Sequence, residues 1–578
     1  MQINAIQFHE ITLDDKKWMD EKLSQDNRNA CEYTFANNFM WRKSYAVEVA
    51  EVSGCLVIRF REGGAYKYSY PVGAGDKRAV IEQLRTVCRQ DGYPLSMSPL
   101  LDADREQLEE WFPGEFLIAE DRDDFDYIYS REKLVTLAGK KLHGKRNHIA
   151  RFKDGGDWHY EPMTEKNLED CRQMTYSWIK MRQEKWNEEM NEEVEVLHEA
   201  FDHKEELGLV GGVLYRGDEI VAFTLGEPLN SDTFVVHFEK AYPEMQGAYP
   251  MINQQFVQHV CGEFSYVNRE EDTGDAGLRK AKLSYYPEIL LKKYVAVDSK
   301  VVYADPKRDA AQITELWTEA FGDSAEEVQF YIENRMTDQN MLVIREDGKI
   351  VSMASFLQAE YRIGGDYVKA YYVYAVATLQ AYRNRGYAAQ ILSFARNWYQ
   401  APLILAPAEQ SLEAYYSKLG YVRAFRGAYH IERAPEDTLM AMELATENWR
   451  MEPVDAETYV KIRDEKLAAD GYVRWDAEAV AYAMAQNERY GGKTVMVVTG
   501  NEAGEPERDV LMYQEADGRV QVIETTLAGE RLANVLHGLC NKIGAKEASY
   551  HTMAGMCQLP EGQEWHLCED GYLGLTLA

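Results

Sequence analysis

The chain has 578 residues, enough for roughly three to five domains. Hydrophobic residues make up 46% and aromatic residues 12%, a composition that excludes an intrinsically disordered protein. The formal net charge is −32, so the overall field of the protein opposes binding of nucleic acid and of anionic lipid.

Targeting and cysteine patterns predict a cytoplasmic protein. The first 15 residues lack the charged and apolar regions of a signal peptide, and no apolar run is long enough to span a membrane. The eight cysteines are scattered without a C-x-x-C pair. We therefore expect reduced, buried thiols, no disulfide framework and no metal site.

The first half of the chain carries a basic stretch that could meet a phosphate or a carboxylate. Six cations lie within 14 residues: Lys140, Lys141, Lys145, Arg146, Arg151 and Lys153. A solvated basic face on an acidic protein is an equally good interpretation. Near a predicted strand end, His237 and Lys240 flank Glu239, which could act as a base. A hydrogen-bonded structural histidine would give the same pattern.

A charged turn near residue 270 is the clearest candidate substrate site of this half. Asn268 and Arg269 are followed by Glu271 and Asp272, with Lys282 close behind. Carboxylates can pair with an ammonium group, so the turn suits an amine or an amino acid. A structural ion-pair turn would look the same in sequence. With Lys240, these residues form the substrate-binding set that we predict for the N-terminal half.

The second half starts near Lys300 and alternates strands and helices. Residues 341–363 predict two strands joined by an Asp347-Gly348 turn, and 368–378 predict the next strand. A helix, a short buried strand (402–407) and a helix ending at Gly420 follow. Residues 421–433 predict a closing strand.

Between the strand and the first of those helices lies Arg383-Asn384-Arg385-Gly386-Tyr387-Ala388. A strand, a glycine-bearing turn and a helix start create a pocket of unpaired backbone N–H groups at the positive end of a helix dipole. Gly386 allows close approach of the backbone to a phosphate. Such a pocket suits a pyrophosphate.

Residues 446–578 repeat the same order of element types but lack this turn. We interpret them as a degenerate second copy, and an unrelated α+β cap is the alternative. The expected domains are 1–298, itself two modules divided near 135–155, then 301–445 and 446–578.

The spacing Arg-x-x-Gly-x-Ala and the AYYSKLGY segment resemble the GNAT (Gcn5-related) N-acyltransferases. The resemblance implies that acetyl-CoA, or another acyl-CoA, is held by Arg383–Ala388. It also implies that backbone N–H groups from Val376 to Thr378 polarise the thioester, and that Tyr416 returns a proton to the leaving sulfur. The base is not identified: Glu360, Tyr374 or a water chain could serve. A degenerate copy following the turn is partly similar to the Eis-type acetyltransferases.

The clusters at 31–49, 70–84, 124–152, 235–257 and 266–288 together resemble the C-terminal domain of the phosphatidylglycerol lysyltransferases, which is a pair of GNAT-like folds. That resemblance implies aminoacyl transfer from aminoacyl-tRNA, which the net charge disfavours. The expected fold is α+β (α/β): tandem GNAT folds with mixed sheets flanked by helices, in four modules paired two by two.

Three functions follow from these patterns. The first is an acyl-CoA-dependent N-acyltransferase whose acceptor is a small amine or an amino-acid-like molecule. The second is an aminoacyl transferase acting through the N-terminal half. The third is a non-catalytic scaffold that binds a metabolite.

Overall fold

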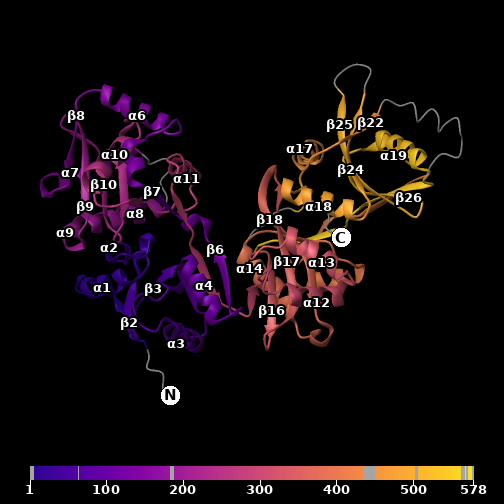
Figure 1. Ribbon diagram of the computed structural model, residues 1–578, viewed down its shortest axis with the longest axis horizontal. Coiled ribbons are helices and arrows are strands. Elements are labelled where there is room, and N and C mark those ends of the chain that lie inside the picture. Colours follow the sequence, from indigo (N-terminus) through magenta and orange to yellow (C-terminus); the bar gives the residue numbers. More distant parts are fainter. Residues whose placement is uncertain are drawn as a thin grey trace. The chain divides into compact units, whose positions relative to one another are not determined.

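The computed structural model describes residues 6–62, 64–181, 188–433, 449–500, 506–560, 567 and 571–575. The chain divides into two compact units, Met1–Ser299 and Lys300–Ala578 (Figure 1). Each unit contains two sheets and is described by itself.

The first sheet of unit 1 contains seven strands in the order β1-β2-β3-β4-β5-β14-β6. Its strands are β1 (His9–Glu10), β2 (Glu48–Val52), β3 (Cys55–Glu62), β4 (Ala65–Tyr68), β5 (Ser96–Leu100), β6 (Phe116–Glu120) and β14 (Tyr294–Asp298). Its helices are α1 (Lys16–Asp26), α2 (Phe35–Met40), α3 (Lys77–Gln90) and α4 (Asp102–Trp111). Helix α3 buries Val80, Ile81, Leu84 and Cys88, a spacing that puts all four on one face.

The second sheet of unit 1 has the order β13-β7-β12-β11-β10-β9-β8. Its strands are β7 (Asp126–Ser130), β8 (Trp158–Pro162), β9 (Val210–Arg216), β10 (Glu219–Pro228), β11 (Thr233–Ala241), β12 (Tyr266–Asn268) and β13 (Ile289–Leu291). Its helices are α5 (Arg131–Thr136), α6 (His143–Asp154), α7 (Glu165–Met181), α8 (Glu188–Asp202), α9 (Lys204–Leu207), α10 (Ala248–Val260) and α11 (Ala276–Leu283).

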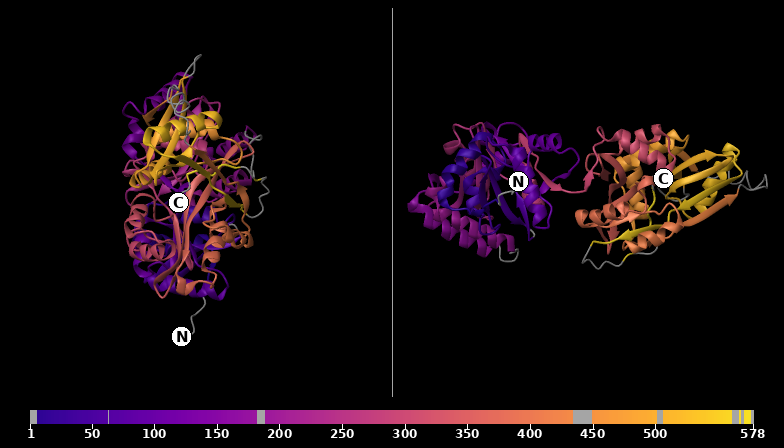
Figure 2. Two further views of the ribbon diagram at one scale, coloured as in Figure 1. Left: turned by 90° about the vertical axis from the view of Figure 1, so that its right-hand side faces the viewer. Right: turned by 90° about the horizontal axis from the view of Figure 1, so that it is seen from below.

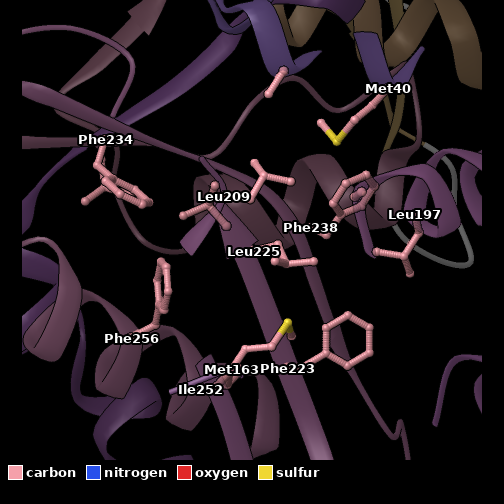
Figure 3. Close-up of a cluster of buried hydrophobic side chains, with 14 of the residues drawn as sticks. Met40, Met163, Leu197, Leu209, Phe223, Leu225, Phe234, Phe238, Ile252 and Phe256 are labelled. Carbon is pink, nitrogen blue, oxygen red and sulfur yellow. The ribbon is translucent and has the colours of Figure 1, made fainter. Parts of the chain in front are cut away.

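The two sheets of unit 1 exchange strands. The chain passes from the first sheet to the second between Glu120 and Asp126, upstream of the expected division at 135–155, and returns at β14 to lie between β5 and β6. One hydrophobic cluster spans both sheets, because it contains Met40 of α2 together with Leu197, Phe223 and Phe238 (Figure 3). The returning strand β14 packs into a second cluster, under the first sheet. Each sheet therefore depends on the other for its completion.

The first sheet of unit 2 has the order β15-β16-β17-β18-β19-β28-β20, with β23 (Val473–Arg474) paired to β17. Its strands are β15 (Val301–Tyr303), β16 (Met341–Glu346), β17 (Lys349–Ile363), β18 (Asp366–Thr378), β19 (Leu403–Leu405), β20 (Val422–Phe425) and β28 (Gly555–Gln558). Its helices are α12 (Ala310–Phe321), α13 (Ala325–Asn334), α14 (Tyr387–Tyr399) and α15 (Glu413–Lys418). The long strands β17 and β18 run between helices on both sides (Figure 2, left).

The second sheet of unit 2 has the order β21-β27-β26-β25-β24-β22. Its strands are β21 (Ala428–Arg433), β22 (Trp449–Pro453), β24 (Lys493–Thr499), β25 (Glu507–Ala516), β26 (Arg519–Thr525) and β27 (Glu547–Thr552). Its helices are α17 (Ala456–Leu467), α18 (Ala477–Arg489) and α19 (Gly529–Ile543). Helix α18 lies beside α13, where Tyr482 stacks on Phe330 with ring centroids 5.4 Å apart (Figure 1).

Unit 2 repeats the strand exchange of unit 1. Strand β28, from the end of the chain, lies between β19 and β20 just as β14 lies between β5 and β6. The single strand expected over 421–433 is two strands, because β20 stays in the first sheet and β21 crosses to pair with β27. The fold prediction is confirmed: four mixed sheets flanked by helices form two pairs. Within the described residues, no helix combines the length and the apolar character that a membrane crossing requires.

Candidate functional site

The turn between β18 and α14 leaves the N-terminus of a 13-residue helix open. Gly386 is the N-cap, with φ of +80°, and no side chain caps the helix. The first N–H groups of a helix have no partner inside it. A Cβ added to Gly386 would meet only the Gln390 side chain, at 3.9 Å. The helix start is therefore uncrowded at Gly386, and the N–H groups of Tyr387 and Ala388 have no partner within the helix.

Two arginines and a tyrosine surround this helix start. Arg383 donates from Nε to the Thr378 carbonyl oxygen (3.1 Å), and Arg385 donates to the Ala381 oxygen (3.2 Å). Both side chains are exposed, as is Asn384, whose φ is +64°. Tyr387 donates to Glu346 at 2.9 Å. The guanidinium groups are thus tethered at the mouth of the turn and retain donors for an anion.

Strand β18 separates from β19 next to the turn. The two strands pair in parallel only at Tyr371 with Leu403 and at Tyr372 with Ile404, although β18 continues to Thr378. A register shift against β17 falls just beyond these pairs, and Ala375 there has a positive φ of 51°. Such a bulge re-aims the backbone. Val376 and Thr378 are half-buried in the part of β18 that β19 does not cover.

Tyr416 lies in α15, the helix that follows β19. Its side chain is buried, and its ring meets Tyr421 edge-on with centroids 5.7 Å apart. Burial and the neighbouring Tyr415 raise the pKa of Tyr416 to about 12. The hydroxyl therefore keeps its proton at neutral pH, as a proton donor requires.

The corresponding helix starts of the other three modules are closed or acidic. The N-cap of α3 is Asp76, whose own carboxylate accepts from the Ala79 N–H. The N-cap of α10 is Gly247, but a Cβ there would lie 2.2 Å from the His148 carbonyl oxygen of α6. Helix α19 begins after Ala528 and carries Glu530 in its first turn. Only α14, among these four helices, combines an open glycine N-cap with adjacent arginines.

The residues present at α14 fit a pyrophosphate. They offer unpaired N–H groups, a helix dipole and two guanidinium groups, and the glycine leaves room for phosphate oxygens.

In unit 1, the structure brings most of the predicted substrate residues together but uses up much of their bonding capacity. Asn268, at the end of β12, is fully buried and donates to Asp126 and to the Asn29 carbonyl oxygen. Asp272 accepts from Arg122, Tyr127 and Arg279, and these bonds overcome burial to lower its pKa to about 2.

The two predicted lysines of this set are also engaged. Lys282 donates to the carbonyl oxygens of Arg269 and Glu271, with the former at 2.7 Å. Lys240 forms an ion pair with Glu193 at 2.5 Å and lies over the Trp178 ring. Glu239 and Lys240 are neighbours on β11, so their side chains point to opposite faces of the sheet. Because Glu239 bonds Arg269, Lys240 points away from Arg269. Arg269 is the member whose surroundings leave a donor unused.

One cluster of unit 1 has the composition of a metal site but contains its own cation. Cys31, Glu32 and Asp126 are the group of metal-type ligands found among the described residues. The Lys293 ammonium lies 2.7 Å from Glu32 and 2.8 Å from Asp126. The lysine occupies the position that a metal ion would take.

His237 of β11 is held between two carboxylates. Its Nδ1 lies 2.7 Å from Glu270 and its Nε2 lies 3.1 Å from Glu227. Because a carboxylate only accepts, both ring nitrogens must carry protons. Burial opposes the charge, but the bonds to Glu227 and Glu270 outweigh it and raise the pKa of His237 to about 10.

This arrangement predicts a pH dependence of stability. The pKa is higher in the folded state, so the contribution of His237 is complete below its ordinary value near 6.5 and is lost as the pH rises towards 10. Urea unfolding at pH 6 and pH 9.5 should show unit 1 less stable at the higher pH. The difference should shrink in His237→Gln, and an equal difference in that variant would contradict the assignment.

Two family models match different parts of the chain. Residues 25–297 match the family model described as phosphatidylglycerol lysyltransferase, C-terminal. Residues 305–424 match the acetyltransferase (GNAT) domain. A solved structure of a conserved protein of unknown function from Bacteroides thetaiotaomicron is 39% identical, with a TM-score of 0.50; the match covers 51% of this chain and all of that one.

The chain belongs to the family of that Bacteroides protein. Its two units carry a lysyltransferase-type domain and a GNAT domain, both from transferase families. L-PGS from Bacillus licheniformis is 16% identical over 49% of this chain and 91% of its own, with a TM-score of 0.36. An uncharacterized protein of Mycoplasmoides gallisepticum is 25% identical over 29% of this chain, which spans 55% of that relative.

Proposed function

We propose that unit 2 transfers an acyl group, acetyl in the simplest case, from acyl-CoA to an amine. The open helix start at Gly386, beside the separated end of β18, is the observation that carries the proposal. The match of residues 305–424 to the GNAT domain supports it.

Each part of the site has one task in this proposal. Bound acyl-CoA supplies the activated thioester. The N–H groups at Tyr387 and Ala388, with Arg383 and Arg385, hold the diphosphate. Backbone N–H groups between Val376 and Thr378 donate to the acyl oxygen, as a preorganised oxyanion site does. The Tyr416 hydroxyl donates its proton to the departing sulfur.

A strong base is not needed by this arrangement. Glu360, one candidate, is paired with Arg474 at 3.1 Å. Tyr374, another, is packed against Trp317 and Tyr331, and burial raises its pKa well above the ordinary range. An amine that enters in its neutral form needs positioning more than deprotonation. Water can then take up the proton.

Tyr416→Phe provides the catalytic test. Acetyl-CoA binding measured by calorimetry should be retained, because the turn is unchanged. Turnover, followed as thiol release with a panel of polyamines, amino acids and lysine peptides, should fall about 100-fold or more. Tyr415→Phe, on the adjacent and more exposed ring, is the control and should keep its activity. Absence of heat with acetyl-CoA in the unmodified protein would refute the cofactor assignment.

The match at 25–297 favours a second candidate, aminoacyl transfer by unit 1. It requires binding of aminoacyl-tRNA, which the net charge of −32 opposes. A mobility-shift assay at low and moderate salt tests it, and lack of any salt-sensitive shift would reject the tRNA version. Turnover with any amine acceptor would reject the third possibility, a non-catalytic scaffold.

A further inference from the structure

Unit 1 also contains a pair of neighbouring strands that stop pairing part-way, and the side chains there differ in chemistry from those of unit 2. Strand β11 pairs with β12 only from Thr233 to Val235 but continues to Ala241. Glu239 lies on the uncovered part of β11, and Arg269 follows the end of β12. In unit 1, the charged side chains of Glu239 and Arg269 therefore lie at the position that corresponds to the uncovered part of β18 in unit 2.

Two buried polar atoms beside the uncovered part of β11 lack a partner. Arg269 donates from one Nη to Glu239 at 2.9 Å, and Asn253 donates its amide to the other oxygen of Glu239 at 3.0 Å. The second Nη of Arg269 and the Oδ1 of Asn253 bond no group among the described residues. Asn253 is 2% exposed, so bulk solvent does not reach its oxygen.

The orientation of Asn253 is fixed by its neighbour. A carboxylate only accepts, so the end of the amide that faces Glu239 must be the NH2 group. The unpaired end is therefore the oxygen, which calls for a donor. Both unused atoms belong to groups that bond the same carboxylate, that of Glu239.

Lys145 of α6 adds a second cation without a carboxylate of its own. Its Nζ lies 3.8 Å from the centre of the Tyr285 ring, and the Arg269 guanidinium carbon lies 5.0 Å from the same centre. Within the described part of the chain, no ion pair of Lys145 is found. Burial and Arg269 lower the pKa of Lys145 to about 8, against the attraction of Glu239. An anion bound here would favour the charged form of Lys145 and offset the repulsion by Arg269.

We propose that Lys145, Arg269 and Asn253 form a binding site for a small carboxylate that carries a neighbouring N–H or O–H donor, such as a free amino acid or hydroxy acid. Two cations against Glu239 leave one positive charge, which suits a singly charged anion. Lys145 and the unused Nη of Arg269 each meet a carboxylate oxygen. The ligand's donor meets the Asn253 oxygen. A basic aminoacyl ester, which is cationic and lacks the carboxylate, fits poorly.

Calorimetry on the full chain tests the site with matched probes. L-alanine and L-lactate should bind, and L-alanine methyl ester should bind at least about tenfold more weakly, because one charge-assisted bond is worth roughly 1.5–3 kcal/mol. Acetate, which lacks the second donor, and inorganic phosphate should also bind more weakly. Equal affinity for acid and ester, tighter binding of phosphate, or no heat with either acid would overturn the proposal.

Variants on α6 locate the site. Lys145→Met keeps the length of the side chain, removes its charge and is partly exposed, so folding should be retained. It should lose at least about tenfold in affinity for L-lactate, and Lys145→Arg should retain binding. Lys153→Met, on the same helix but over the Trp158 ring, is the control and should bind normally. Unchanged binding in Lys145→Met would refute the site. Acetyl-CoA titration of the same variant reports on unit 2 separately.

Discussion

Gly386→Glu is expected to weaken acetyl-CoA binding at least about 100-fold, or about 2.8 kcal/mol. The new carboxylate would stand at the helix N-terminus, where it would repel the diphosphate and compete for the free N–H groups. The φ of +80° adds strain of roughly 1–2 kcal/mol for a residue with a Cβ. Calorimetric titration with acetyl-CoA measures the loss.

Gly348→Glu separates strain from charge. Gly348 lies in the turn between β16 and β17 with φ of +78°, and a Cβ there meets nothing within 4 Å. The same substitution at this position should cost similar strain yet leave acetyl-CoA affinity unchanged. If both variants bind acetyl-CoA equally, the Arg383–Ala388 turn does not hold the cofactor.

Glu524→Gln is expected to destabilise unit 2 by about 3–5 kcal/mol, because it leaves the Arg463 guanidinium buried without a counter-ion. Both side chains are inaccessible to solvent, and Arg463 Nε lies 3.1 Å from Glu524. Glu524 also accepts from Tyr459 and Tyr572. Urea unfolding followed by tryptophan fluorescence measures the change.

Glu515→Gln is the matched control for that experiment. Glu515 pairs with Lys493 at 3.0 Å on the surface, where both side chains are more than a third exposed. Its loss should cost at most about 1 kcal/mol. If Glu524→Gln and Glu515→Gln lower the free energy of unfolding equally, the buried Arg463–Glu524 pair stabilises unit 2 no more than a surface ion pair does.

Local features were predictable because local chemistry fixes them. The Asp347-Gly348 turn, the end of α15 near Gly420 and the start of α14 at Gly386 each depend on residues close in sequence. Pairing between distant strands was not predictable. A strand such as β21 shows its type in its own residues, but nothing within it identifies β27, more than a hundred residues later, as its partner.

The candidate sites also differ in how much of each could be predicted from residues close in sequence. The turn in unit 2 is one continuous segment, so sequence alone indicated it. In unit 1, Asn268, Asp272 and Lys282 look available in sequence, yet partners from distant segments occupy them. Asn253 gave no signal, because its unpaired oxygen depends on Glu239 facing the other end of the amide.

The exchanged strands also bear on how the protein is made. About 130 residues separate β20 from β28, which fills the gap between β19 and β20. At ribosomal rates of roughly 5–20 residues per second, that gap stays open for on the order of 10 s during synthesis. Buried strand edges are then exposed on the nascent chain. In each unit, both sheets therefore remain incomplete on the nascent chain until the last strands have been synthesised. Unit 1 can be complete before synthesis of unit 2 begins.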